Sequence, residues 1–354
     1  MYKRQEKNIR QVVPYVPGEQ PAGDKIVKLN TNENPYPPAP GVKKVLEEME
    51  ADRLRKYPDP TASILVKELA SYYGLNEDQV FVGVGSDDVL AMSFLTFFNS
   101  DKPVLFPDVT YSFYKVWADL FKVPFETPVL KEDFTIDVKD YEKENGGVIF
   151  PNPNAPTGVY MPLDQVEEIL KANQDVVVIV DEAYVDFAGP SALELLDKYE
   201  NLLVVQTFSK SRSMAGMRIG FAMGHPDLIR ALNDVKYSYN SYTMNLPSLL
   251  AGVEAVKDKE YFEKTIEKIV ATRERAKKRL TELGFTFPNS QSNFIFASHK
   301  SVPAGKIFEA LKKEQIYVRY FKTPGLDNSL RISIGTDEEM DTLFRFLEAY
   351  LPNA

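Results

Sequence analysis

The chain has 354 residues, 44% of them hydrophobic and 26% charged, which is the composition of an ordinary globular protein long enough for two domains. Its net charge of −9 argues against nucleic acids and anionic membranes as partners. Because cysteine is absent, disulfides, thiol catalysis and thiolate metal sites are excluded, and with only two histidines we expect no metal centre.

The amino-terminal stretch lacks the apolar core of a signal peptide, and no run reaches the roughly 18 apolar residues that span a bilayer, so we expect a cytoplasmic protein. Residues 1–40 are rich in Pro, Asn and Gly, which predicts an extended arm. Tyr15 and Asn30 are candidate substrate contacts if this arm lines a pocket. The alternative is an arm that only packs across a surface.

Apolar residues at helical spacing predict helices over 42–49 and 64–72. Residues 80–90 then predict a strand, a glycine-rich turn and a helix. Ser86 is a good N-cap for that helix, and the free N–H groups of its first turn can hold a phosphate. The Gly-x-Gly pattern is weak by itself, and a purely structural turn is the alternative.

The next predicted strand, 104–106, is followed by Tyr111, an aromatic residue that could stack on a flat ligand but that, taken alone, more often packs in a core. A strand at 147–150 leads into a rigid polar loop, Pro-Asn-Pro-Asn-Ala-Pro-Thr-Gly. The β-branched run 176–180 is typical of a strand buried on both faces of a parallel sheet. Asp181 follows its carboxyl end, where such sheets place ligands, so a functional role is favoured over a simple cap.

Lys210 lies just past another predicted strand, 202–206. Desolvation and nearby cations favour the neutral amine of a lysine, which can form a Schiff base with an aldehyde. Arg212 and Arg218 could supply that positive charge or hold a phosphate. Two hydroxyl residues offer donors for the same phosphate: Thr207 and Ser209. A single Ser-Lys pair is most often a solvated loop, and only the neighbouring strand ends favour function.

Strands and helices alternate from about residue 41 to 240, which predicts a mostly parallel α/β sheet with right-handed crossovers. A long helical region, 246–280, would link this part to a second lobe. The last seventy residues have an α+β pattern. We therefore expect four segments: an arm that contributes to a small domain (1–40), a large cofactor-binding domain (41–250), a linking helical region (251–284) and the small carboxyl-terminal domain (285–354).

Four motifs follow one another at the predicted strand ends: Asn-Pro-Asn-Ala-Pro-Thr-Gly, Val-Asp-Glu-Ala-Tyr, Ser-Lys-Ser and Gly-Met-Arg-Ile-Gly. In this order they resemble the fold-type-I pyridoxal-phosphate aminotransferases, over essentially the whole chain. Four further motifs are typical of the histidinol-phosphate aminotransferase subgroup; they lie at 29–35, 55–60, 181–187 and 330–336. The resemblance implies a large domain with a mostly parallel sheet sandwiched by helices, plus a smaller α+β domain.

The resemblance also implies roles for individual residues. Lys210 would bind the aldehyde of pyridoxal 5′-phosphate and later move a proton, and Asp181 would pair with the protonated ring nitrogen. Tyr184 would donate to the phenolic oxygen, and Tyr111 would stack on the ring. Groups implied for the cofactor phosphate come from Ser86, Asp87, Thr207, Ser209 and Arg218. Tyr57 would reach the phosphate of a neighbouring subunit, which implies a homodimer.

One position departs from the family pattern. Ala155 stands where the family has an Asn that bonds the phenolic oxygen, and Asn154 is the candidate replacement. For the substrates, the resemblance implies exchange of an amino group between histidinol phosphate and 2-oxoglutarate, which yields glutamate. Arg331 resembles the family's carboxylate-binding arginine. Arg319 and Tyr15 are candidates for the histidinol-phosphate end, with solvated surface as the alternative.

Three other functions remain open from the sequence. The first is an aminotransferase that uses aromatic amino acids. The second is a lyase, threonine-phosphate decarboxylase, on a closely similar scaffold. The third is a non-catalytic ligand-binding relative, and the presence of Lys210 argues against it.

Overall fold

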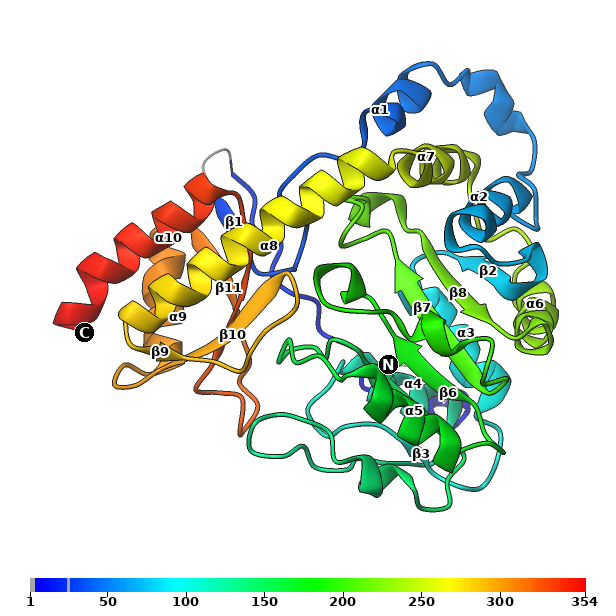
Figure 1. The fold of residues 1–354 in the computed structure, drawn as a ribbon, viewed down its shortest axis with the longest axis horizontal. Coiled ribbons are helices and arrows are strands. Elements are labelled where there is room, and N and C mark those ends of the chain that lie inside the picture. Colours follow the sequence, from blue (N-terminus) through cyan, green and yellow to red (C-terminus); the bar gives the residue numbers. More distant parts are fainter. Residues whose placement is uncertain (1–3, 24–25) are drawn as a thin grey trace.

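The computed structural model describes residues 4–23 and 26–354, so residues 1–3 and 24–25 of the predicted arm lie outside the described residues. Within the described ranges the strands form two sheets, one of seven strands and one of five. Figure 1 shows these sheets in separate lobes, with the long helix α8 (Lys259–Glu282) running from one lobe to the other. No helix in these ranges is both long and apolar enough to cross a membrane.

The larger sheet has the order β2-β8-β7-β6-β5-β3-β4. Its strands are β2 (Val80–Gly83), β3 (Val104–Leu105), β4 (Phe125–Glu126), β5 (Gly147–Pro151), β6 (Val178–Asp181), β7 (Leu202–Thr207) and β8 (Gly220–Gly224). Neighbours from β4 to β7 pair in parallel, and β8 runs antiparallel to both of its neighbours. The prediction of a mostly parallel α/β sheet is therefore confirmed.

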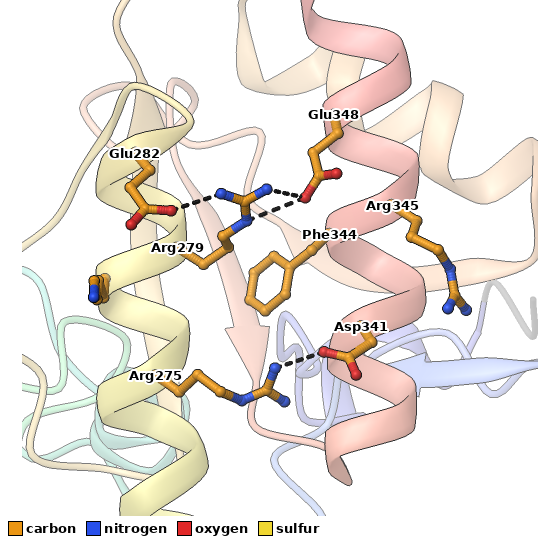
Figure 2. A pocket seen from close by; sticks show the side chains of 8 residues that line it. Arg275, Arg279, Glu282, Asp341, Phe344, Arg345 and Glu348 are labelled. Atoms are coloured by element: carbon orange, nitrogen blue, oxygen red, sulfur yellow. Dashed lines mark hydrogen bonds and ion pairs between the residues drawn. The ribbon is translucent and has the colours of Figure 1, made fainter.

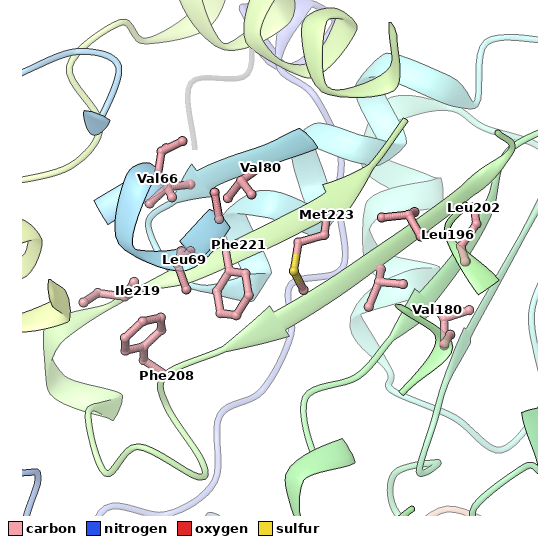
Figure 3. Packing of buried hydrophobic residues seen from close by; sticks show 14 of the residues in the cluster. Val66, Leu69, Val80, Val180, Leu196, Leu202, Phe208, Ile219, Phe221 and Met223 are labelled. Carbon is pink, nitrogen blue, oxygen red and sulfur yellow. The ribbon is translucent and has the colours of Figure 1, made fainter. Parts of the chain in front are cut away.

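Side chains alternate between two apolar clusters along the central strands, as expected for strands buried on both faces. Val178 and Val180 join one cluster, which Figure 3 shows from close by, and Ile179 joins the other. Helices cover both faces, so the sheet is sandwiched as predicted. One face is covered by α1 (Pro40–Glu47), α2 (Ser63–Tyr73), α5 (Leu163–Ala172) and α7 (Leu246–Lys257), and the other by α3 (Ser86–Phe97), α4 (Phe113–Phe121) and α6 (Pro226–Tyr239).

The smaller sheet has the order β1-β11-β12-β10-β9. Its strands are β1 (Val27–Leu29), β9 (Phe285–Thr286), β10 (Phe294–His299), β11 (Ile316–Tyr320) and β12 (Leu330–Ser333). The arm contributes β1, which pairs in parallel with β11. Helices α9 (Ala304–Lys313) and α10 (Asp337–Tyr350) complete this α+β lobe.

Ion pairs join α8 to α10 on the surface of the smaller lobe, as Figure 2 shows. Arg275 pairs with Asp341, and Arg279 pairs with Glu348. Exposed pairs of this kind contribute little to stability, so the buried Phe344 between the two helices is the stronger contact.

One local prediction was wrong. Ser86 is not an N-cap: Gly85 holds that position with φ +84°, and Ser86 is the first helical residue. The predicted helical region after residue 246 is confirmed, and it consists of two helices, because Asp258 leaves helical geometry and its carboxylate accepts a hydrogen bond from the Tyr261 N–H. Short 3-10 helices complete the described chain: Glu6–Asn8, Ala51–Arg55, Glu77–Gln79, Val138–Tyr141, Val185–Phe187, Ala192–Leu195, Ala215–Met217 and Leu351–Asn353.

Candidate active site

The candidate site lies at the carboxyl edge of the larger sheet, where several strands end side by side. In register, Asp181 at the end of β6 lies opposite Pro151 of β5 and Val205 of β7. Lys210 follows β7 within three residues. The arm residues next to β1 and the smaller lobe's strand β12 contact this edge, as the following hydrogen bonds show.

Lys210 is half-buried, and its amine has a single weak hydrogen bond. Nζ donates to the Thr31 carbonyl at 3.3 Å and lies 5.7 Å from the ring centre of Tyr184. No carboxylate of the described residues pairs with it. The amine is therefore held at the sheet edge without an ion pair that would have to be broken before it reacted with an aldehyde.

Arg212 points away from this edge, which corrects the expectation that it could hold a phosphate. Its Nη1 donates to the Ala255 carbonyl at 2.7 Å, and its guanidinium lies 4.2 Å from the ring centre of Phe262. Its side chain is buried in the packing between β7 and the helices α7 and α8. Two residues beyond Lys210, the turn has already directed the side chain into the core of the larger lobe.

Asp181 is a carboxylate that is only 4% exposed. It accepts hydrogen bonds from the Tyr114 hydroxyl at 2.8 Å and from the Ala183 N–H at 3.2 Å. Burial raises the pKa of Asp181 to about 6, even though both hydrogen bonds lower it. A cationic ring nitrogen placed beside this carboxylate would lower that pKa again, so Asp181 fits the role of a partner for a protonated pyridine.

Sequence reasoning missed Tyr114. It lies on α4 among aromatic residues of a buried cluster, and nothing in the sequence distinguished it from a core tyrosine. The same carboxylate and the same burial raise the pKa of Tyr114 well above its ordinary value, so its hydroxyl keeps the proton that it donates to Asp181.

Arg218 lies against the amino-terminal turn of α3. Nη1 donates to Ser209 Oγ at 3.3 Å, and Nη2 lies 3.5 Å from a carboxylate oxygen of Asp87. A Cβ at Gly85 would come within 2.4 Å of this guanidinium, and one at Gly220 within 2.2 Å of the Ser86 nitrogen. The two glycines therefore permit the close approach of Arg218 to free helix N–H groups, an arrangement that suits a phosphate.

Thr207 and Tyr111 flank this cluster. Thr207 Oγ1 donates to the Ile219 carbonyl at 3.3 Å and accepts from the Ser209 N–H at 3.1 Å, so it shapes the turn. The Tyr111 hydroxyl donates to Asp87 at 2.8 Å. Burial, helped by that carboxylate, raises the pKa of Tyr111 well above its ordinary range, so the phenol stays protonated.

Tyr184 meets a partner that sequence reasoning missed. Its hydroxyl oxygen accepts a hydrogen bond from Asn32 Nδ2 at 2.9 Å, and its ring packs edge-on against Phe294. Asn32 belongs to the polar stretch after β1, which lies in the predicted arm. No spacing rule connects two residues 152 positions apart, so only the fold reveals the contact.

Asn154 is buried, and its side-chain amide forms hydrogen bonds within its own loop and with the loop before Tyr111. Nδ2 donates to the Val109 carbonyl at 2.9 Å and to Thr157 Oγ1 at 3.1 Å, and Oδ1 accepts from Thr110 at 3.3 Å. These bonds hold the segment that leads into Tyr111. The neighbouring Ala155 instead packs in the apolar cluster that contains Tyr184.

Arg331 and Arg319 are cross-strand partners on β12 and β11. Arg331 Nη2 donates to the Asn30 carbonyl at 3.1 Å, while its Nε is buried and has no hydrogen-bond partner among the described residues. Burial and the nearby Arg319 lower the pKa of Arg331. An unpaired buried donor beside a second cation fits an anionic ligand.

Tyr15 and Asn30 lie in the arm near these arginines. Tyr15 is half-buried and stacks on Phe113 with ring centres 4.2 Å apart. Asn30 is buried, and its side-chain amide donates to the Glu19 carbonyl at 2.7 Å, so its contact with the site is through its own carbonyl.

Tyr57 also stands apart from the cluster. It is 81% exposed and lies beside Tyr242, with ring centres 4.6 Å apart.

Comparisons with known proteins agree with this geometry. The family model described as aminotransferase class I and II matches residues 24–347. A histidinol-phosphate aminotransferase from Clostridium acetobutylicum is 53% identical over 340 residues, which cover 96% of this chain and 97% of that protein. One from Brachyspira hyodysenteriae is 51% identical over 345 residues, covering 97% and 98%.

A solved structure is also similar. The crystal structure of histidinol-phosphate aminotransferase from Sinorhizobium meliloti, in complex with pyridoxal-5′-phosphate, superposes with a TM-score of 0.81 at 25% identity. The match covers 92% of this chain and 89% of that one. The fold predicted from the sequence motifs, that of the fold-type-I transferases, is confirmed.

Proposed function

Because the chain belongs to the class I and II aminotransferases, we propose that it exchanges an amino group between histidinol phosphate and 2-oxoglutarate, in histidine biosynthesis, with pyridoxal phosphate as its cofactor. The proposal depends on one observation: the Lys210 amine and the buried Asp181 carboxylate lie at the same sheet edge. Beside them is the pair Arg319 and Arg331, for which the described residues provide no carboxylate partner.

When bound, pyridoxal phosphate supplies an aldehyde for amine exchange and a ring that withdraws electrons from the substrate's α-carbon. Lys210 would hold the aldehyde and move the proton at that carbon, and its amine donates to the Thr31 carbonyl. Asp181, kept in place by Tyr114, would hold the proton on the ring nitrogen.

The remaining residues bind and orient. Arg218, Ser209 and the amino terminus of α3 hold the phosphate group, with Ser86 and Asp87 in the first turn of that helix. Tyr111 would cover the ring, and Tyr184 would donate to the phenolic oxygen. Thr207 and Asn154 hold the turns that carry these groups.

The arginine pair supports the choice of substrates. Histidinol phosphate carries a phosphate in place of an α-carboxylate, whereas glutamate carries two carboxylates. Planar guanidinium groups bind both kinds of anion, so Arg331 and Arg319 can serve the two half-reactions in turn, with Tyr15 beside them. An aromatic aminotransferase and threonine-phosphate decarboxylase remain the alternatives. The names of the relatives favour histidinol phosphate as the substrate over both of them.

We also propose a cytoplasmic homodimer. The support is Tyr57, an exposed aromatic residue that no site of its own chain uses. Within the subunit we propose an arm (1–40), a large cofactor domain (41–250), a linking region (251–284) and a small domain (285–354), a division that agrees with the two sheets.

Lys210→Ala tests the cofactor assignment. We expect the absorbance of the lysine-bound cofactor and the turnover to be lost, while Lys198→Ala, an exposed lysine of the same lobe, keeps both. Near-normal turnover of the Lys210 variant would refute the assignment.

Spectral titration of the wild-type holoenzyme tests the substrate. Histidinol phosphate, histidine, phenylalanine and threonine phosphate are compared in parallel, and histidinol phosphate should discharge the lysine-bound absorbance at the lowest concentration. Release of CO₂ from threonine phosphate would instead identify the lyase.

A further inference from the structure

A closed circuit of hydrogen bonds surrounds Asn32, a buried residue of the arm. Its backbone N–H donates to Ser333 Oγ at 2.9 Å, and Ser333 Oγ in turn donates to Asn32 Oδ1 at 3.1 Å. Asn32 Nδ2 donates to the Tyr184 hydroxyl at 2.9 Å, and Asn293 Nδ2 donates to the Asn32 carbonyl at 3.0 Å. Every polar group of this asparagine is therefore engaged.

The circuit has a fixed direction. Ser333 Oγ accepts the Asn32 N–H and donates its own proton to Asn32 Oδ1, the amide oxygen. The amide nitrogen then faces Tyr184 and can only donate. Asn32 also has φ +55°, a left-handed conformation that costs free energy for most residues and that its surroundings hold in place.

This arrangement determines where the Tyr184 hydroxyl can donate its proton. Since the Tyr184 oxygen receives a hydrogen bond from Asn32, its own O–H must find another acceptor, and none of residues 4–23 and 26–354 provides one. The Lys210 amine lies 5.7 Å from the ring centre of this tyrosine, so Tyr184 is beside the amine that would hold the cofactor.

We propose that Asn32 is a positioning residue that fixes the Tyr184 hydroxyl as a hydrogen-bond donor toward the cofactor's phenolic oxygen, and that Ser333 sets the orientation of Asn32. This inference rests on the proposed cofactor site. Ser333 lies two residues from Arg331 on β12, so the strand that binds the substrate anion also sets the direction of the Tyr184 proton.

The test is a pH titration of the cofactor's absorbance in the substrate-free holoenzyme. A hydrogen bond to the phenolic oxygen matters most once the proton shared with the lysine nitrogen has left, so it lowers the titration midpoint. Asn32→Ala should raise the midpoint by about half a unit, roughly a threefold change in proton affinity. Ser333→Ala, a milder change, should move it in the same direction by less.

A double-mutant cycle with Tyr184→Phe separates this role from a merely structural one. If Asn32 acts through the hydroxyl, Asn32→Ala should shift the midpoint by less than about 0.2 units when Tyr184 is already Phe. A full shift in that background would overturn the inference. So would an equal shift in Asn293→Ala, which loosens the backbone of Asn32 and leaves its side chain in place.

The same experiment distinguishes this inference from the cofactor assignment. If wild-type protein showed no lysine-bound absorbance with added pyridoxal phosphate, the cofactor site itself would be wrong. A normal wild-type titration with an unchanged midpoint in Asn32→Ala and Ser333→Ala would overturn only the role of Asn32.

Discussion

Arg319 and Arg331 illustrate a cost that a binding site imposes on single residues. They face each other across β11 and β12, and no carboxylate of the described residues lies within ion-pair distance of either. Like charges opposite each other destabilise a sheet by about 0.2–1 kcal/mol. An anionic ligand bound between the two guanidinium groups would explain why two like charges lie opposite each other.

Arg319→Leu should therefore have opposite effects on binding and stability. Removing one charge-assisted contact should raise the KM for histidinol phosphate about 10- to 100-fold. The melting temperature of the ligand-free protein should rise by about 1–2 °C, because the repulsion is relieved. Arg345→Leu, an exposed arginine on α10, is the matched control and should change neither quantity. An unchanged KM in Arg319→Leu would exclude Arg319 from the substrate site.

At the scale of elements, Glu182 ties the ends of β6 and β7 together. Its carboxylate accepts hydrogen bonds from Ser191 Oγ at 2.6 Å, the Ala192 N–H at 2.6 Å and Gln206 Nε2 at 2.9 Å. Gln206 accepts in turn from the Tyr73 hydroxyl on α2. This buried group has no cation beside it, and burial raises the pKa of Glu182 to about 7.

Glu182→Gln should change how stability depends on pH. The folded protein binds a proton on Glu182 more tightly than the unfolded chain, whose Glu pKa is about 4.5. The stabilisation is thus complete below pH 4.5 and is lost as the pH rises to about 7, on the order of 3 kcal/mol. In cofactor-free protein, urea midpoints from pH 5 to 8 should fall less for Glu182→Gln than for wild type. Glu194→Gln, an exposed neighbour, should follow the wild type, and parallel curves for all three would contradict the argument.

How well each element could be predicted depended on how local its cause is. The β6 strand was predictable because β-branched residues fill both faces, and Asp181 and Lys210 followed from their places after strand ends. Strand β8 was missed because it begins and ends with glycine, which is not typical of strands. Glycine is needed at position 220 because the strand passes close to the turn before α3. The role of Asn32 could not be predicted from the sequence, since its partner Ser333 lies 301 positions away.

At the scale of the whole molecule, the arm joins the two lobes at the site. The Asn34 side chain donates to the Ser211 carbonyl of the larger lobe at 3.0 Å, while Asn32 is bound to Ser333 of the smaller lobe. The carbonyl of Thr31, the residue before Asn32, accepts a hydrogen bond from Lys210. These three arm residues thus fix the position of the small sheet relative to the reactive amine, in parallel with the covalent link through α8 (Figure 1).

The exposed aromatic surface formed by Tyr57 and Tyr242 gives a test of the proposed dimer. These residues are 81% and 47% exposed, and Tyr239 nearby is 75% exposed, which is unusual for large apolar side chains on a surface without a partner. If a second copy covers this surface, Tyr242→Glu should shift the protein toward monomer in sedimentation experiments. Val129→Glu, at a residue that is 72% exposed, is the control and should leave the dimer intact.

Mixed dimers determine whether Tyr57 serves the neighbouring site. Tyr57→Phe should weaken cofactor binding about 10-fold by removing a hydrogen bond to the phosphate. In a dimer of one Tyr57→Phe subunit and one Lys210→Ala subunit, the intact Lys210 belongs to the subunit whose partner still has Tyr57. If the residues are shared across the interface, this one site is complete and should bind pyridoxal phosphate with wild-type affinity and show turnover. If Tyr57 serves its own chain, the mixed dimer should keep the weakened affinity of Tyr57→Phe, because the site with Lys210 would then still contain the Phe.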